Sequence, residues 1–255
     1  GACEKDHKHG LRKKETMAKR LRILGIVMVV FGVVFAGAGV FAFTQVQAGA
    51  NSLQTFSEAQ NVLLGYNEDG QLIDRGTTEG AAAIMDLLEN EWGYPVVDGD
   101  LDPNDPLVNT ATEYMFQMAT IGYHILHGTQ TVELTESVEY NGETFPAGVY
   151  ELDVRTVGER GDLGGYWTDF DRQHPIEGPA RSQAWSGTAH ALYGELGVGA
   201  VTASTLQLST GVSAMIFGLG LTIIILGAGM IWIASSKEET AVMLTSSDTP
   251  EGATV

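Results

Sequence analysis

The chain has 255 residues, with 32 Asp and Glu against 14 Lys and Arg, so its formal net charge is −18 at neutral pH. A field of this sign repels nucleic acid, and no nucleic-acid partner is expected. The single cysteine, Cys3, leaves the rest of the chain without a disulfide or a thiol nucleophile.

Two uncharged apolar runs dominate the sequence: residues 23–43 (21 residues) and residues 212–234 (23 residues). As α-helices rising 1.5 Å per residue, either run spans a hydrocarbon core of about 30 Å. The sequence therefore predicts two helices in a lipid bilayer, preceded by a basic N-terminus (1–22) and followed by a polar tail (235–255). Residues 44–211 lie between them and are long enough to form one folded domain.

Basic residues set the expected orientation. Lys and Arg gather before the first run, whereas only Arg181 lies near the second run on the domain side, and Lys237 follows it. The positive-inside rule then places both termini in the cytoplasm and residues 44–211 outside the plasma membrane. The first run exceeds the 7–15 residues of a signal-peptide core, so an uncleaved anchor is expected. The six basic residues nearest to its start are Arg12, Lys13, Lys14, Lys19, Arg20 and Arg22.

Residues 44–211 hold 25 Asp and Glu against five Arg and no Lys, a net charge of −20. Two interpretations remain open at this point. The bias is an adaptation of the whole organism to its solvent, or it serves a cationic ligand or a basic partner.

The first half of the domain is predicted to contain a helix, a β-hairpin and two further helices. Residues 44–62 continue the first apolar run as a helix, and residues 63–77 form a short hairpin that turns at residues 68–70. Thr77 or Thr78 caps a helix that ends near Trp92. After an Asp- and Pro-rich loop (97–106), Thr110 and Glu113 form a capping box that begins a helix ending near His127.

The second half begins with β structure. Residues 129–154 alternate as strands, with a type I′ turn at Asn141-Gly142, and predict an antiparallel sheet of three or four strands. Residues 158–179 form a loop anchored by Tyr166, Trp167 and Phe170, and a helix from about Ala180 leads to the second apolar run. The tail, 235–255, is expected to be disordered. The predicted fold class is α+β.

Residues 98–105 contain the closest grouping of candidate metal ligands in the sequence and predict a calcium-binding loop. Asp98, Asp100, Asp102 and Asp105 place carboxylates close together, as hard cations require. An EF-hand is excluded because Pro103 stands where Gly is needed and Asn109 where the bidentate Glu is needed. The alternative is a polar turn that leads into the Thr110 cap.

Histidines supply a weaker metal hypothesis. His124 and His127 lie one turn apart on the predicted 110–127 helix, and His174 or His190 could complete a zinc or iron site. The alternative makes His127 a cation in the last turn of its helix. This set is the basis of a metal-dependent ectoenzyme as an alternative function. No Gly-x-Ser-x-Gly elbow and no glycine-rich phosphate loop is present.

Small residues occur at four-residue spacing in both apolar runs, at Gly32 and Ala36 in the first and at Ala214 and Gly218 in the second. Such stripes allow close helix packing. The two runs pack on each other, or they pack on a membrane-protein partner. Neither run contains a charge that could serve an ion path.

The segments DLDPNDPLVNTATEYM (100–115), YHILHGTQTV (123–132) and YWTDFDRQHPIEGPARSQAW (166–185) resemble a group of two-span membrane proteins of high-GC Gram-positive bacteria. The resemblance implies a plasma-membrane location and carries no catalytic residues. We therefore expect a non-catalytic membrane protein with an external interaction or accessory domain. The alternatives are the metal-dependent ectoenzyme and a ligand sensor that relays through a partner.

Overall fold

The computed structural model describes residues 2–154 and 170–246, with side chains from residue 16 to residue 236 within these ranges. The predicted anchors Tyr166 and Trp167 lie outside the described residues. The chain divides into two compact units: unit 1 comprises residues 1–49 and 206–255, and unit 2 comprises residues 50–205. Helices make up most of the described chain, together with small antiparallel sheets.

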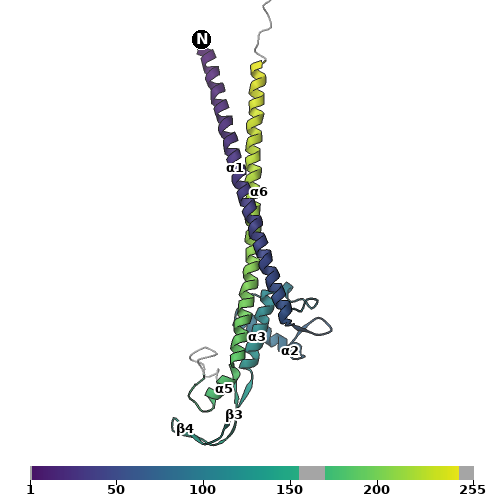
Figure 1. Cartoon of the computed structure of the whole chain (residues 1–255), viewed down its shortest axis with the longest axis vertical. Coiled ribbons are helices and arrows are strands. Elements are labelled where there is room, and N and C mark those ends of the chain that lie inside the picture. The colour runs from purple at the N-terminus through teal and green to yellow at the C-terminus, as the bar shows by residue number, and fades with distance from the viewer. Residues whose placement is uncertain (1, 155–169, 247–255) are drawn as a thin grey trace, which may run out of the picture. The chain divides into compact units, whose positions relative to one another are not determined.

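Unit 1 consists of parts of two long helices, α1 (Ala2–Gln60) and α6 (Gly187–Ser246), which run antiparallel and side by side (Figure 1). Both are long and apolar enough to cross a membrane, over Thr16–Gln60 and Gly187–Ser236. Helix α6 continues through residues 235–246, into the tail for which disorder is expected. A helix already formed extends at little cost, because only its first turn is expensive to form.

Small residues repeat every seven positions along the contact between the two helices. A Cβ on Gly25 would lie 2.7 Å from the Gly227 carbonyl oxygen, and one on Gly32 would lie 2.8 Å from that of Gly220. A seven-residue repeat keeps one seam on the partner helix and gives a left-handed crossing. The buried series are Ala18, Gly25, Gly32 and Gly39 on α1, and Ser213, Gly220, Gly227 and Ala234 on α6.

Of the two predicted small-residue stripes, the one on α1 lies in the contact between the helices and the one on α6 lies outside it. On α1, Gly32 and Ala36 contact α6, since the same Gly220 carries a hypothetical Cβ 2.8 Å from the Ala36 Cα. On α6, Gly218 has nothing within 4 Å of a hypothetical Cβ, and Ala214 is exposed. The α6 stripe lies off the seam because Ala214 is one residue from the seam position Ser213 and Gly218 is two residues from Gly220, and each residue turns the helix by about 100°.

Unit 2 begins with the hairpin of β1 (Gly65–Tyr66) and β2 (Leu72–Ile73), as predicted. Thr77 caps α2 (Thr78–Asp86), which continues as a π-helical turn, η1 (Leu87–Glu91). A short 3-10 turn, η2 (Asp98–Asp100), precedes α3 (Ala111–Leu126). The main core joins Ile84 and Leu88, both fully buried, to Phe116 of α3 and Leu196 of α6.

The predicted sheet of three or four strands is wrong. Within the part of the chain that the structure describes, strands β3 (Thr129–Leu134) and β6 (Gly148–Asp153) pair with each other, and β4 (Val138–Tyr140) pairs only with β5 (Glu143–Phe145). The four strands thus form one long hairpin in two successive ladders. Its tip is the predicted type I′ turn, with positive φ at Asn141 and Gly142. Strand propensity predicted the strands, but it carries no information on their partners.

Helix α5 (Glu177–Ala184) packs against this hairpin. Ile176 and Ala180 join the buried Val132 of β3 in a small core. A second small core joins Phe170, Ala184 and Trp185 to Val154. Phe170 is therefore an anchor, as predicted. The helical conformation is interrupted at Trp185 and Ser186 before α6 begins. The single helix predicted from Ala180 is therefore two helices, α5 and α6.

Candidate functional site

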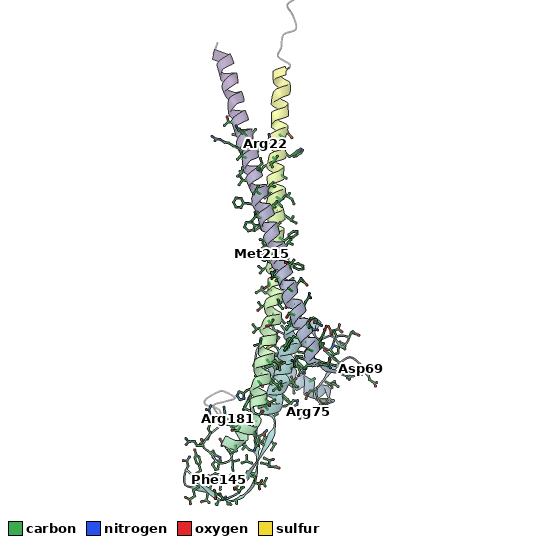
Figure 2. All side chains as sticks on the ribbon, viewed as in Figure 1. Arg22, Asp69, Arg75, Phe145, Arg181 and Met215 are labelled. Carbon is green, nitrogen blue, oxygen red and sulfur yellow. The ribbon has the colours of Figure 1, made fainter. Side chains whose placement is uncertain are left out.

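His124 is held by a carboxylate that the sequence analysis did not select. Its Nε2 lies 3.0 Å and 2.9 Å from the two carboxylate oxygens of Asp74. Asp74 is positioned by a type I′ turn in which Arg75 (φ 48°) and Gly76 (φ 84°) are left-handed (Figure 2). Two backbone hydrogen bonds between Asp74 and Thr77, each 2.9 Å, close this turn.

His127 is engaged separately from His124. Its Nδ1 donates to the Tyr123 carbonyl oxygen at 2.9 Å, and its ring stacks on the Tyr123 ring with centroids 4.1 Å apart. His190 Nδ1 lies 3.0 Å from the Ser186 carbonyl oxygen, in the first turn of α6. In the described part of the chain, no three His, Cys, Asp or Glu side chains are gathered to hold a metal ion. The histidine metal site stays a prediction.

Glu113 has the structural role that its sequence position predicts. Its carboxylate accepts hydrogen bonds from the backbone amides of Asn109 and Thr110, at 2.9 Å and 2.8 Å, and from the Thr110 hydroxyl. Burial raises the pKa of this carboxyl above its ordinary value, and the hydrogen bonds offset only part of that effect. The capping box of α3 is thus formed as predicted.

The aspartate loop forms a series of turns. Asp98 and Asp100 lie in η2, and Asp102 and Asp105 form an isolated bridge. The Asp102 carboxylate accepts the backbone and side-chain N–H groups of Asn104 at 2.8 Å and 2.9 Å, which lowers the pKa of Asp102. Calcium binding here stays a prediction. A calcium-dependent rise in melting temperature that disappears in Asp100→Asn with Asp102→Asn would support it.

A tyrosine of α3 lies between the two long helices inside unit 2. The Tyr114 hydroxyl is 2.7 Å from Ser57 Oγ of α1, and Ser57 and Tyr114 are 1% and 4% exposed. The Tyr114 ring covers Gly199 of α6, where a Cβ would lie 2.5 Å from its Cε1 atom. The reciprocal contact is made by Tyr193 of α6, whose hydroxyl packs on Gly122 of α3. We call Ser57, Tyr114 and Gly199 the helix junction.

A polar network joins the β4–β5 hairpin to α5. The Tyr140 hydroxyl donates to Asp171 at 2.6 Å, and the Glu177 carboxylate accepts the Asp171 amide at 2.9 Å. The hydrogen bond from Tyr140 is the largest cause of the lowered pKa of Asp171. His174 Nδ1 accepts the amides of Ile176 and Glu177, and so satisfies two backbone donors at the start of α5. Phe145, whose ring meets His174 edge-on, lies at the hairpin end of unit 2 (Figure 2).

No family model matches this chain, and no curated protein or solved structure is similar to it. Contacts distant in sequence, which no local pattern predicts, include the Asp74–His124 pair, the Tyr140–Asp171 hydrogen bond and the helix junction. Gly122 and Gly199, both glycines inside helices, are the local signals of the two close approaches by tyrosine side chains.

Proposed function

We propose that this chain is a plasma-membrane protein with two spans, which presents residues 44–211 outside the cell as a non-catalytic interaction or accessory domain. The observation that carries the proposal is the exposed apolar surface of α1 and α6. Only 17% and 11% of their most apolar 18-residue windows are buried. The core helix of a water-soluble protein would be mostly buried.

The exposed side chains are large and surround the helix pair. Phe31 and Val34 on α1 are 59% and 62% exposed, and Met215 and Ile225 on α6 are 68% and 69% exposed. Leaving such side chains in water costs about 25 cal/mol for each Å² of apolar surface. A bilayer removes this cost, and a contiguous patch of this extent is typical of a membrane surface.

Orientation follows from charge. Lys19, Arg20 and Arg22 precede the apolar part of α1, which favours a cytoplasmic N-terminus. The antiparallel pairing of α6 then brings the C-terminus to the same side. The net charge of −20 for residues 44–211 would also keep this domain away from anionic headgroups.

Cysteine labelling tests this topology in intact cells. Asp69 is exposed in the β1–β2 turn (Figure 2), so Asp69→Cys in a Cys3→Ser background should react with a membrane-impermeant maleimide. The native Cys3 should react only after the membrane is permeabilised. Labelling of Cys3 without labelling of Asp69→Cys would reverse the orientation. If the lysed cells are separated into membrane and soluble fractions, recovery of the protein in the soluble fraction would overturn the membrane proposal.

The accessory role is tested by native mass spectrometry of the full chain, extracted in mild detergent from its own membrane. An additional protein mass would support the proposal and identify the partner. A bare chain carrying a stoichiometric metal ion would instead favour the metal-dependent ectoenzyme, with His124 and His127 as first candidates for ligands.

A ligand sensor is the second candidate, and the helix junction favours it. Tyr114 contacts both Ser57 of α1 and Gly199 of α6, so a displacement of α3 would move both helices within unit 2. Once a partner is identified, Tyr114→Phe should change the activity of the partner without changing its binding. Tyr123→Phe, which alters a tyrosine of α3 outside the helix junction, is the matched control.

A further inference from the structure

One end of the helix pair in unit 1 combines exposed cations with an exposed tryptophan. Lys19 and Arg20 of α1 are exposed, and Trp232 of α6 is 74% exposed. The antiparallel contacts pair Gly25 with Gly227 and Gly32 with Gly220, and this register, continued outward along both helices, brings Arg20 of α1 level with Trp232 of α6. Arg22 is labelled at this level of α1 in Figure 2. We call Lys19, Arg20 and Trp232 the basic end.

The charges at this end belong to α1 and not to the tail. Residues 2–22 contain eight Lys and Arg against three Asp and Glu, a net of +5, whereas residues 235–255 contain one Lys against four acidic residues, a net of −3. An anionic surface at this end of the helix pair would therefore be attracted by residues 2–22 of α1 and not by the tail after α6. Tryptophan is enriched at the headgroup level of membranes, which places Trp232 beside the lipid phosphates.

We propose that the basic end binds the headgroups of anionic phospholipids, such as phosphatidylglycerol, in preference to zwitterionic ones. This inference rests on the proposed membrane location. Lys and Arg donate hydrogen bonds to phosphate oxygens, and each one near an anionic surface favours association by about fivefold at low salt. The preference weakens as salt screens the charges.

Trp232 supplies a native reporter. The full chain is reconstituted in vesicles that contain a small fraction of either brominated phosphatidylcholine or brominated phosphatidylglycerol, because bromine quenches tryptophan fluorescence on contact. The remaining tryptophans, Trp92, Trp167 and Trp185, lie in the domain that the proposal places outside the bilayer. Trp232→Phe should therefore abolish the quenching and confirm its source.

We expect stronger quenching by brominated phosphatidylglycerol than by brominated phosphatidylcholine at equal mole fraction. Lys19→Gln with Arg20→Gln should lower this preference by roughly fivefold for each lost charge, and about 1 M salt should lower it in the unmodified chain. Arg75→Gln with Arg172→Gln removes two exposed cations from unit 2 and should leave it unchanged.

The outcomes separate the two proposals. Absence of quenching by either brominated lipid would overturn the membrane location. Equal quenching by both lipids in the unmodified chain would overturn only the lipid preference. A preference that survives both high salt and the double Gln variant would also overturn the assignment to Lys19 and Arg20. If the double variant fails to insert, the salt dependence of the unmodified chain still decides.

Discussion

Two glycines of α6, two positions apart, test the packing of the helix pair. A Cβ on Gly220 would contact the Ala36 amide nitrogen and lie 2.8 Å from both the Ala36 Cα and the Gly32 carbonyl oxygen, whereas a Cβ on Gly218 would meet nothing within 4 Å. Ordinary contact begins at 3.4 Å, so the helices must separate by at least 3.4 − 2.8 = 0.6 Å in Gly220→Ala. The obstructing atoms belong to the backbone and cannot rotate away.

The free-energy difference follows from two opposing terms. Gly→Ala in a helix gains up to about 1 kcal/mol of intrinsic propensity, and this gain applies to both variants. Overpacking costs about 1–3 kcal/mol and applies only to Gly220→Ala. We therefore expect Gly220→Ala to be less stable than Gly218→Ala by about 1–3 kcal/mol. Gly218→Ala should be at least as stable as the unmodified chain.

Separation of the helices can be followed by energy transfer between dyes on Val33→Cys and Leu219→Cys in a Cys3→Ser background. Both positions are exposed, at 57% and 49%, and they flank the Gly32–Gly220 contact. Titration of the detergent-solubilised chain with SDS gives the free energy of separation for each variant. Equal effects of the two alanine substitutions would refute the assignment of Gly220 to the seam.

Three further substitutions address unit 2 in the full chain. Tyr114→Phe should lower the free energy of unfolding by about 1 kcal/mol by stranding the buried Ser57 hydroxyl, and a double-mutant cycle with Ser57→Ala should show their coupling in denaturant titrations. The pKa of Glu113 is raised above 4.5, so its favourable contribution is present below that value and is lost as pH rises through the raised pKa. Glu113→Gln should therefore gain stability relative to the unmodified chain as pH rises from below 4.5 through the raised pKa of Glu113, and a constant difference would contradict this. Tyr140→Phe should raise the pKa of Asp171 towards 3.8, measured by NMR titration of the carboxyl carbon, and an unchanged value would show that Tyr140 is not its cause.

Local features of the fold could be predicted from the sequence because each depends on residues within one or two turns. The Thr110–Glu113 capping box, the Thr77 cap and the Asn141-Gly142 turn are of this kind. In the two caps, side chains bond to backbone groups three or four residues away. In the turn, Asn141 and Gly142 tolerate the left-handed backbone conformation that the turn requires. The pattern of residue types is then sufficient to place them.

Partners distant in sequence could not be predicted in the same way. Asp74 is 50 residues from His124, and Ser57 is 57 residues from Tyr114. In so acidic a domain, no pattern distinguishes Asp74 from the other carboxylates. The seven-residue repeat of Ser213, Gly220, Gly227 and Ala234 is visible in the sequence of α6, but the four-residue stripe at Ala214 and Gly218 is equally typical of a packing face.

The long hairpin has a consequence for solubility. Among the described residues, β3 pairs with β6 alone and β4 with β5 alone, so the outer edge of each strand has no strand partner there. Residues 129–154 contain no Lys or Arg, and their glutamates, Glu133, Glu136, Glu139, Glu143 and Glu151, are all exposed. Like charges on approaching copies repel each other, so the acidity of this hairpin protects it from edge-to-edge aggregation. Acidification below about pH 4 would remove that protection.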